Sequence, residues 1–135
     1  MNRENELNFI QAMYDGRDLD MRKMLQSGFD PTDGEDVDLA GGIVLITAVE
    51  IGHLDVVRAL LEDGRADPSI DNNQALYLSC CQRKYEICFA LLSDQRVRSE
   101  LKNTPYLQQY DFLPKLNGDA KNICRIMQLI MDYSE

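Results

Sequence analysis

Residues 45–68 constrain the fold of this chain most, because they read as two short helices joined by a tight turn. The first helix ends at Gly52, since glycine adopts the left-handed backbone that closes a helix at little cost. Gly64 ends the second helix, and Pro68 then turns the chain away, because the residue before a proline is pushed out of the helical region. The second helix has one apolar stripe at i, i+3 and i+4 spacing, made of Val57, Leu60 and Leu61. One such hairpin cannot bury its apolar face alone, so the pattern predicts further copies.

Degraded copies of this hairpin lie on both sides of it. The matching residues 36 positions upstream are Ala12, Gly16, Met24, Leu25 and Gly28. Those 31 positions downstream are Leu76, Tyr85, Glu86, Ile87, Ala90, Leu91, Leu92 and Asp94. A fourth copy starts at Thr104-Pro105, where threonine suits the N-cap and proline the first helical position. We therefore expect four units, at about 4–31, 42–69, 73–98 and 104–133.

The Gly52-His53 turn, the Gly64 stop and the Thr104-Pro105 opening are similar to those of ankyrin repeats. This resemblance implies an all-α, ankyrin-repeat-like solenoid of about four stacked helix-turn-helix units with atypical terminal caps. We expect residues 1–135 to form one such domain. The third unit departs from the pattern, because Arg83-Lys84 replaces Gly-His and its turn must close without glycine.

The fourth unit departs further from the repeat pattern. Pro114 would break a helix that runs through it. We therefore expect a short inner helix near 105–110, an irregular loop over 111–118 and an outer helix over 120–133.

Hydropathy argues for a folded chain without a membrane span. The hydrophobic fraction of 44% is too high for disorder, and the sequence has no run of about 18 apolar residues of the kind that crosses a bilayer. The N-terminal residues 1–7 also lack the apolar segment of a signal peptide. We expect a cytoplasmic protein, with the nucleus as an alternative location.

The formal net charge of −9 bears on the class of partner. A polyanionic nucleic acid would be repelled, so we expect no nucleic-acid binding. The acidity favours a protein partner with a basic patch. The alternative, which we favour as a starting point, is that the charge serves solubility alone.

The cysteines and the single histidine do not form a plausible zinc site. No Cys-x-x-Cys pair occurs among the four cysteines, which are Cys80, Cys81, Cys88 and Cys124. Cys80 and Cys88 take the helix positions of Val49 and Val57 in the central hairpin. We expect them to be small buried residues in a reducing compartment rather than a disulfide.

The sequence predicts no enzyme. A hydrolytic triad would need His53 as its base, but the resemblance implies a structural histidine whose ring bonds backbone between neighbouring units. Pairs of carboxylates are uninformative among 23 acidic residues, and no glycine-rich phosphate loop is present. We therefore predict no catalytic residue, no metal ligand and no cofactor.

An acidic segment, residues 30–38, joins the first two units. A calcium loop needs glutamate at its twelfth position, whereas the twelfth residue from Asp30 is Gly41, so this pattern fails. We favour a solvated loop, and the alternative is a loop that attracts a basic patch of a partner. The candidate contact residues in it are Asp33, Glu35, Asp36 and Asp38.

A second candidate surface follows the central hairpin. Residues 71–73 are Asp-Asn-Asn, which tolerate the backbone of a tight turn. The resemblance implies that such turns between units, and the exposed face of the first helix of each unit, contact partners. The candidates on this path are Ile70, Asp71, Asn72, Gln74 and Tyr77. Tyr77 offers a large contact area at low entropic cost, and the alternative is that it packs within the stack.

The last predicted helix, over 120–133, is apolar over a wider arc than the ~100° stripe of an ordinary surface helix. We favour its packing against 106–117. The alternative is an exposed interface that would make the protein a homodimer instead of a monomer.

The function that we predict is a protein–protein interaction module that binds and occludes a protein partner. It would act as an inhibitor or adaptor, and a mimic of a host protein is one form of this. The alternative is a structural protein that assembles through its C-terminal helix.

Overall fold

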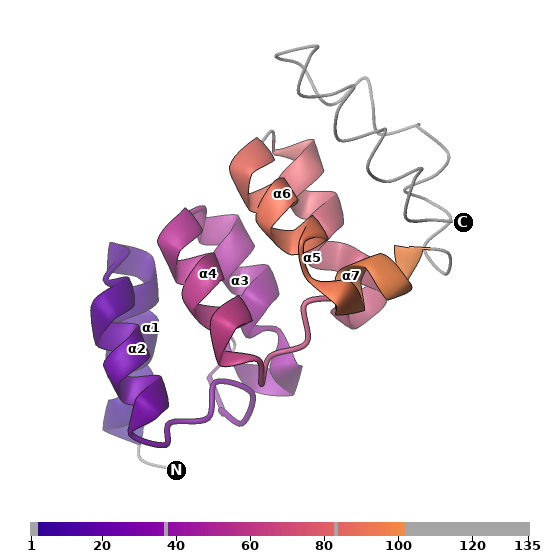
Figure 1. The fold of residues 1–135 in the computed structure, drawn as a ribbon. Coiled ribbons are helices and arrows are strands. Elements are labelled where there is room, and N and C mark those ends of the chain that lie inside the picture. The colour runs from indigo at the N-terminus through magenta and orange to yellow at the C-terminus, as the bar shows by residue number, and fades with distance from the viewer. Residues whose placement is uncertain (1–2, 37, 83, 102–135) are drawn as a thin grey trace. The chain divides into compact units, whose positions relative to one another are not determined.

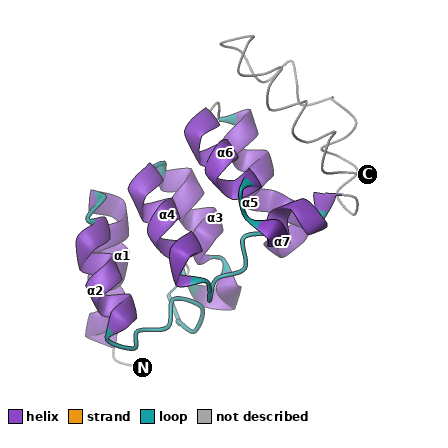
Figure 2. Ribbon diagram, viewed as in Figure 1, coloured by secondary structure: helices purple, strands orange, loops and turns teal. Residues whose placement is uncertain are grey.

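The computed structural model describes residues 3–36, 38–82 and 84–101, and no strand occurs among them (Figure 2). The chain divides into two compact units, residues 1–67 and 68–135. The first unit contains α1 (Arg3–Asp15), α2 (Asp18–Gln26), α3 (Val44–Ile51) and α4 (Leu54–Asp63) (Figure 1). The second contains α5 (Ile70–Cys81), α6 (Tyr85–Leu92) and α7 (Gln95–Ser99). The predicted all-α class is confirmed for the residues that the structure describes.

The first unit consists of two helical hairpins that pack side by side. Helices α1 and α2 form one hairpin, α3 and α4 form the other, and the two meet through α1 against α3 and α2 against α4. The side chains that fill the unit without exposure to solvent include Phe9, Met13, Met21, Leu45 and Leu60. Full burial stabilises the fold by roughly 1.5–3 kcal/mol for each such side chain, so packing between hairpins holds the unit together.

The predicted glycine stops of the central hairpin are confirmed. Gly52 ends α3 with a φ of 91°, and Gly64 ends α4 with a φ of 84°. Each glycine N–H closes the preceding turn, on the carbonyl of Ala48 at 3.0 Å and on that of Leu60 at 3.3 Å. These positive φ angles would strain any residue with a Cβ, which explains glycine at both helix ends.

Helix α5 begins with an unusual backbone. Asp71, Asn72 and Asn73 all have positive φ, at 55°, 58° and 61°, before regular helical backbone follows. Asn73 is buried, and its side-chain Nδ2 donates to the carbonyl of Val97 at 3.1 Å. Asn and Asp tolerate left-handed backbone better than other residues with side chains, so the predicted turn lies where the sequence placed it.

The hairpin of the second unit closes without glycine, as expected from its sequence. The N–H of Gln82 bonds the carbonyl of Leu78 at 2.9 Å, and the N–H of Lys84 returns to the carbonyl of Ser79 at 2.9 Å. Helix α7 was not predicted. It is only five residues long, and the carboxylate of Asp94 caps it by accepting the N–H of Arg96 at 2.9 Å.

Several predictions lie outside the described residues. These are the fourth unit at 104–133, with its short inner helix, its loop over 111–118 and its outer helix, as well as Cys124 and the dimer interface on residues 120–133. Among the described helices, none is both long enough and apolar enough to span a bilayer.

Candidate protein-interaction surfaces

The acidic loop (residues 30–38) is anchored to α1. Glu6 is almost fully buried, and its carboxylate accepts the backbone N–H of Asp36. The guanidinium of Arg3 lies 3.2 Å from the carboxylate of Asp36, and the hydroxyl of Tyr14 donates to the carboxylate of Asp38 at 3.2 Å. The loop is therefore held at two points of α1, two helical turns or more apart.

Close packing also determines the path of the acidic loop. A Cβ at Gly34 would lie 2.8 Å from the Cβ of Leu39 and 3.0 Å from a carboxylate oxygen of Glu6. The first distance is too short for any side chain and the second is tight, so glycine is the residue that fits here without movement of the loop. Since Leu39 is fully buried, the loop cannot shift outward without opening the core at this point.

The expectation of a freely solvated acidic loop is therefore wrong for part of it. Asp36 and Asp38 are half-buried and bonded to α1, whereas Asp33 and Glu35 are exposed. The difference arises because Glu6, distant in sequence, supplies an acceptor for the loop backbone. The structure thus displays two carboxylates on a loop whose backbone is fixed.

Tyr14 adds an aromatic side chain beside this loop, and the sequence analysis missed it. It is 50% exposed although large and aromatic. Repulsion from the Asp38 carboxylate, with smaller contributions from Glu50 and Asp36, raises the pKa of Tyr14 above its ordinary value. Helical periodicity could have shown it, because Phe9 and Met13 face the core and Tyr14 is rotated away from both by about 100° or more. The surface around Tyr14 therefore has a negative potential that suits a cationic group.

The acidic loop also borders a hollow of about 580 Å³ in the first unit. Its walls include Lys23 and Met24 of α2, and Phe29 and Asp33 from the segment that follows. Phe29 stacks on Phe9 with ring centroids 4.5 Å apart, so this wall is supported by the core. The hollow offers both apolar and charged groups to a side chain of another protein.

The second candidate surface is the entry segment (residues 70–77) at the start of α5. Its left-handed residues Asp71 and Asn72 are exposed. The other predicted contact residues, Ile70, Gln74 and Tyr77, are half-buried. The turn therefore projects two polar side chains into solvent, and Tyr77 offers only part of its ring.

His53 has the structural role that was predicted for it. Its Nε2 lies 3.1 Å from the carbonyl oxygen of Tyr14, at the end of α1 in the neighbouring hairpin. A Cβ at Gly16 would lie 3.1 Å from the ring, so this ring fits closely against the preceding hairpin. The histidine links the backbones of two hairpins, which accounts for its place after the Gly52 turn.

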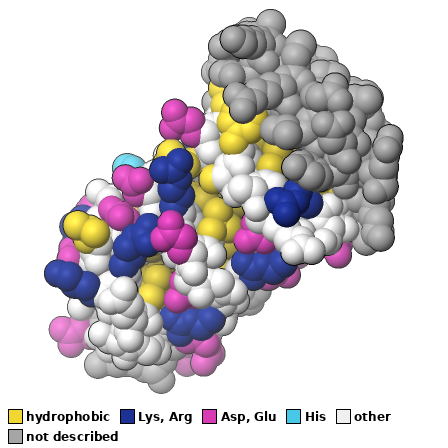
Figure 3. Space-filling view, viewed as in Figure 1, with side chains coloured by type: hydrophobic (Ala, Val, Ile, Leu, Met, Phe, Trp, Pro, Cys, Tyr) yellow, Lys and Arg dark blue, Asp and Glu magenta, His cyan; other side chains and the backbone are white. Residues whose placement is uncertain are grey.

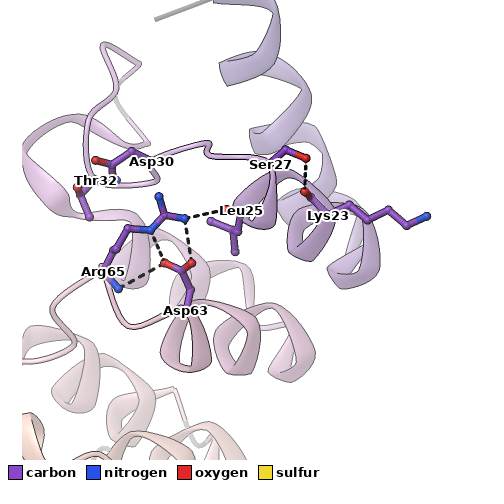
Figure 4. A network of polar contacts seen from close by, with 7 residues as sticks. All are labelled: Lys23, Leu25, Ser27, Asp30, Thr32, Asp63 and Arg65. Atoms are coloured by element: carbon purple, nitrogen blue, oxygen red, sulfur yellow. Dashed lines mark hydrogen bonds and ion pairs between the residues drawn. The ribbon is translucent and has the colours of Figure 1, made fainter.

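A second link joins the same two hairpins through Arg65 (Figure 4). The guanidinium lies 2.9 Å from the Asp63 carboxylate and donates to the carbonyl of Leu25 at 3.1 Å, near the end of α2. The hydrogen bonds from Arg65 lower the pKa of Asp63. Nearby, the hydroxyl and the N–H of Thr32 lower the pKa of Asp30. The guanidinium of Arg65 thus donates to a carbonyl at a helix end, while the Asp63 carboxylate holds this guanidinium in place.

We expect Arg65→Ala to destabilise the protein by about 1 kcal/mol at pH 7, because a helix-end carbonyl and a carboxylate lose their donor while water partly compensates at this half-exposed site. Folding lowers the pKa of Asp63, so its contribution is complete above the unfolded pKa of about 3.9 and is lost as pH falls through the folded value. The stability difference between the two proteins should therefore shrink below about pH 4. Urea unfolding across this pH range measures it.

Arg58 provides the matched control for this prediction. It lies on α4, is exposed, and has no ion pair with the described residues. Arg58→Ala should change the free energy of unfolding by less than about 0.5 kcal/mol at every pH. Equal effects of the two substitutions would show that the Arg65 contacts do not join the hairpins.

Comparison with protein families agrees with this architecture. Residues 9–103, which are most of the chain, match the family model described as ankyrin repeats, in three copies. The chain belongs to the ankyrin-repeat family. No curated protein and no solved structure matches it significantly. The predicted ankyrin-repeat solenoid is thereby confirmed as its fold class.

Membership of the ankyrin-repeat family defines the general activity. Ankyrin repeats are protein-interaction modules that bind protein partners and are typically non-catalytic. Among the described residues, no three histidine, cysteine or acidic side chains gather as metal ligands would. On the face seen in Figure 3, acidic side chains of the described residues are interspersed with Lys and Arg.

Proposed function

We propose that this ankyrin-repeat protein binds a protein partner with a basic patch, through the acidic loop and the entry segment. The observation that carries the proposal is the anchoring of the acidic loop by buried Glu6, which leaves Asp33 and Glu35 exposed on a fixed backbone. A preformed loop loses little entropy on association, and its charge speeds encounter with a basic surface. Asp36 and Asp38 would act mainly through their negative potential, because both are bonded to α1.

The entry segment would supply the second set of contacts. Asp71 and Asn72 are its exposed polar residues, while Ile70, Gln74 and Tyr77 would add partly buried contact area. Tyrosine at such a position gives affinity because its ring is large and has few rotatable bonds.

The consequence of binding that we propose is occlusion, so that the protein acts as an inhibitor or adaptor in the cytoplasm or nucleus. Ankyrin repeats bind through preformed surfaces, so each unit can cover part of a partner without a change in its own fold. Such binding blocks the other contacts of the covered surface and needs no catalytic group.

A charge-reversal experiment tests the proposal. We expect Asp33→Lys combined with Glu35→Lys to lower affinity for the captured partner about tenfold or more, since loss of two attractions costs more than 1.4 kcal/mol. Partner proteins are captured from a cell lysate, identified by mass spectrometry, and their affinities are then measured at two salt concentrations. The loss should be smaller at high salt because surface charges are screened.

The matched control reverses two other exposed carboxylates, Asp55 on α4 and Glu86 on α6. Asp55→Lys with Glu86→Lys changes net charge equally but lies outside the proposed surfaces. It should keep affinity within about twofold. Equal losses in both variants would mean that only net charge matters, and no loss in the first would rule out the acidic loop.

A further inference from the structure

The hairpin of α5 and α6 holds two cysteine thiols in direct contact. The Sγ atoms of Cys80 and Cys88 lie 3.0 Å apart, and neither side chain is exposed to solvent. Contacts between non-bonded carbon atoms are about 3.5–4.0 Å, and a disulfide bond is about 2.05 Å long. The two sulfur atoms are therefore already closer than ordinary packing requires. We propose that Cys80 and Cys88 form a reversible disulfide that joins α5 to α6.

The position of the pair supports this inference. Cys80 lies near the end of α5 and Cys88 in the first turns of α6, on either side of the turn that reverses the chain. Small side chains at these positions let the two helices approach closely, and the neighbours Leu76 and Leu91 are fully buried. A disulfide here needs the two sulfur atoms to approach from 3.0 Å to about 2.05 Å.

The chemistry is an exchange with a small disulfide such as oxidised glutathione. One cysteine loses its proton and attacks a glutathione sulfur, so that a mixed disulfide forms and one glutathione thiolate leaves. The second cysteine then attacks the protein sulfur of that mixed disulfide and releases the second glutathione. Two protein thiols give up two electrons and two protons, and one glutathione disulfide becomes two glutathione thiols.

Burial decides how fast each step occurs. The first step needs a brief opening of the hairpin, because both thiols are inaccessible in the closed structure. The second step is fast, because the remaining thiol already lies in contact with the sulfur atom that it attacks. In a reducing compartment the pair stays as thiols. More oxidising conditions would join α5, which carries the entry segment, covalently to α6. This property is independent of the proposed function.

Peptide mapping of the full-length protein tests the assignment. Trypsin cuts after Arg83 and Lys84, between the two cysteines, so a disulfide would keep the flanking peptides joined. The folded protein is incubated with oxidised glutathione, blocked with iodoacetamide and digested without reductant. We expect one joined species that links Cys80 to Cys88, which fragmentation distinguishes from a link to Cys81, and which dithiothreitol removes.

The thermal midpoint provides the second readout. Oxidation should raise it by about 5 °C, and dithiothreitol should reverse the shift. Cys81→Ala should keep both the link and the shift, whereas Cys88→Ala should lose both. A folded wild-type protein that stays fully reduced after prolonged exposure, or that links Cys80 or Cys88 to another cysteine instead, would overturn the proposal. The tryptic peptide map of the wild-type protein tests the proposal even if a variant folds poorly.

Discussion

Phe9→Ala is expected to reduce the free energy of unfolding by about 4 kcal/mol. Phe9 is fully buried in α1 and stacks on Phe29 with ring centroids 4.5 Å apart and planes inclined by 25°. Truncation removes the buried ring and leaves a cavity, and it also removes an aromatic pair worth about 0.5–1.5 kcal/mol. Urea unfolding followed by far-UV circular dichroism measures the loss.

Leu19→Ala is the control for Phe9→Ala. Leu19 lies on α2 and is 69% exposed. Its truncation should change stability by no more than about 0.5 kcal/mol. If the two variants unfold at the same urea concentration, Phe9 does not belong to the core that joins the first helix to the rest of the unit.

Gly34→Ala is expected to reduce the free energy of unfolding by about 2 kcal/mol, because a methyl group at this position overlaps the Leu39 side chain. The acidic loop must move to make room, which breaks the bond between Glu6 and the Asp36 N–H. We therefore expect weaker partner binding as well as lower stability. Urea unfolding and partner affinity are measured on the same preparation.

Two further substitutions separate these effects. Asp33→Ala, at the exposed neighbour of Gly34, should leave stability within about 0.5 kcal/mol of wild type. Glu6→Gln preserves an acceptor oxygen for the Asp36 N–H and should cost less than Gly34→Ala. If Gly34→Ala were as stable as wild type, the loop would not be closely packed at this point.

The repeat architecture could be predicted from sequence because its signals are local. Glycine at residues 52 and 64 ends two helices through a backbone angle that depends on that residue alone. The Asp-Asn-Asn turn at 71–73 was predicted for the same reason. The role of His53 was predicted only through resemblance to ankyrin repeats, because its acceptor, the Tyr14 carbonyl, lies 39 positions away.

The shape of the acidic loop could not be predicted, because it depends on contacts between distant parts of the chain. Glu6 lies on the same face of α1 as the buried Phe9 and Ile10, but its role as an acceptor could not be predicted, because the N–H that it accepts belongs to Asp36, 30 positions away. Charge alone suggested a solvated loop. Helix α7 was missed because five residues are too few to show a helical period, and its cap at Asp94 resembles that of an ordinary turn.

Hydrogen exchange of the protein, alone and bound to the captured partner, tests the account most directly. A preformed binding surface predicts slower exchange on binding in two segments, 33–36 of the acidic loop and 70–77 of the entry segment, with little change elsewhere. Protection confined to the second helices of the hairpins, α2, α4 and α6, with both segments unchanged, would contradict it.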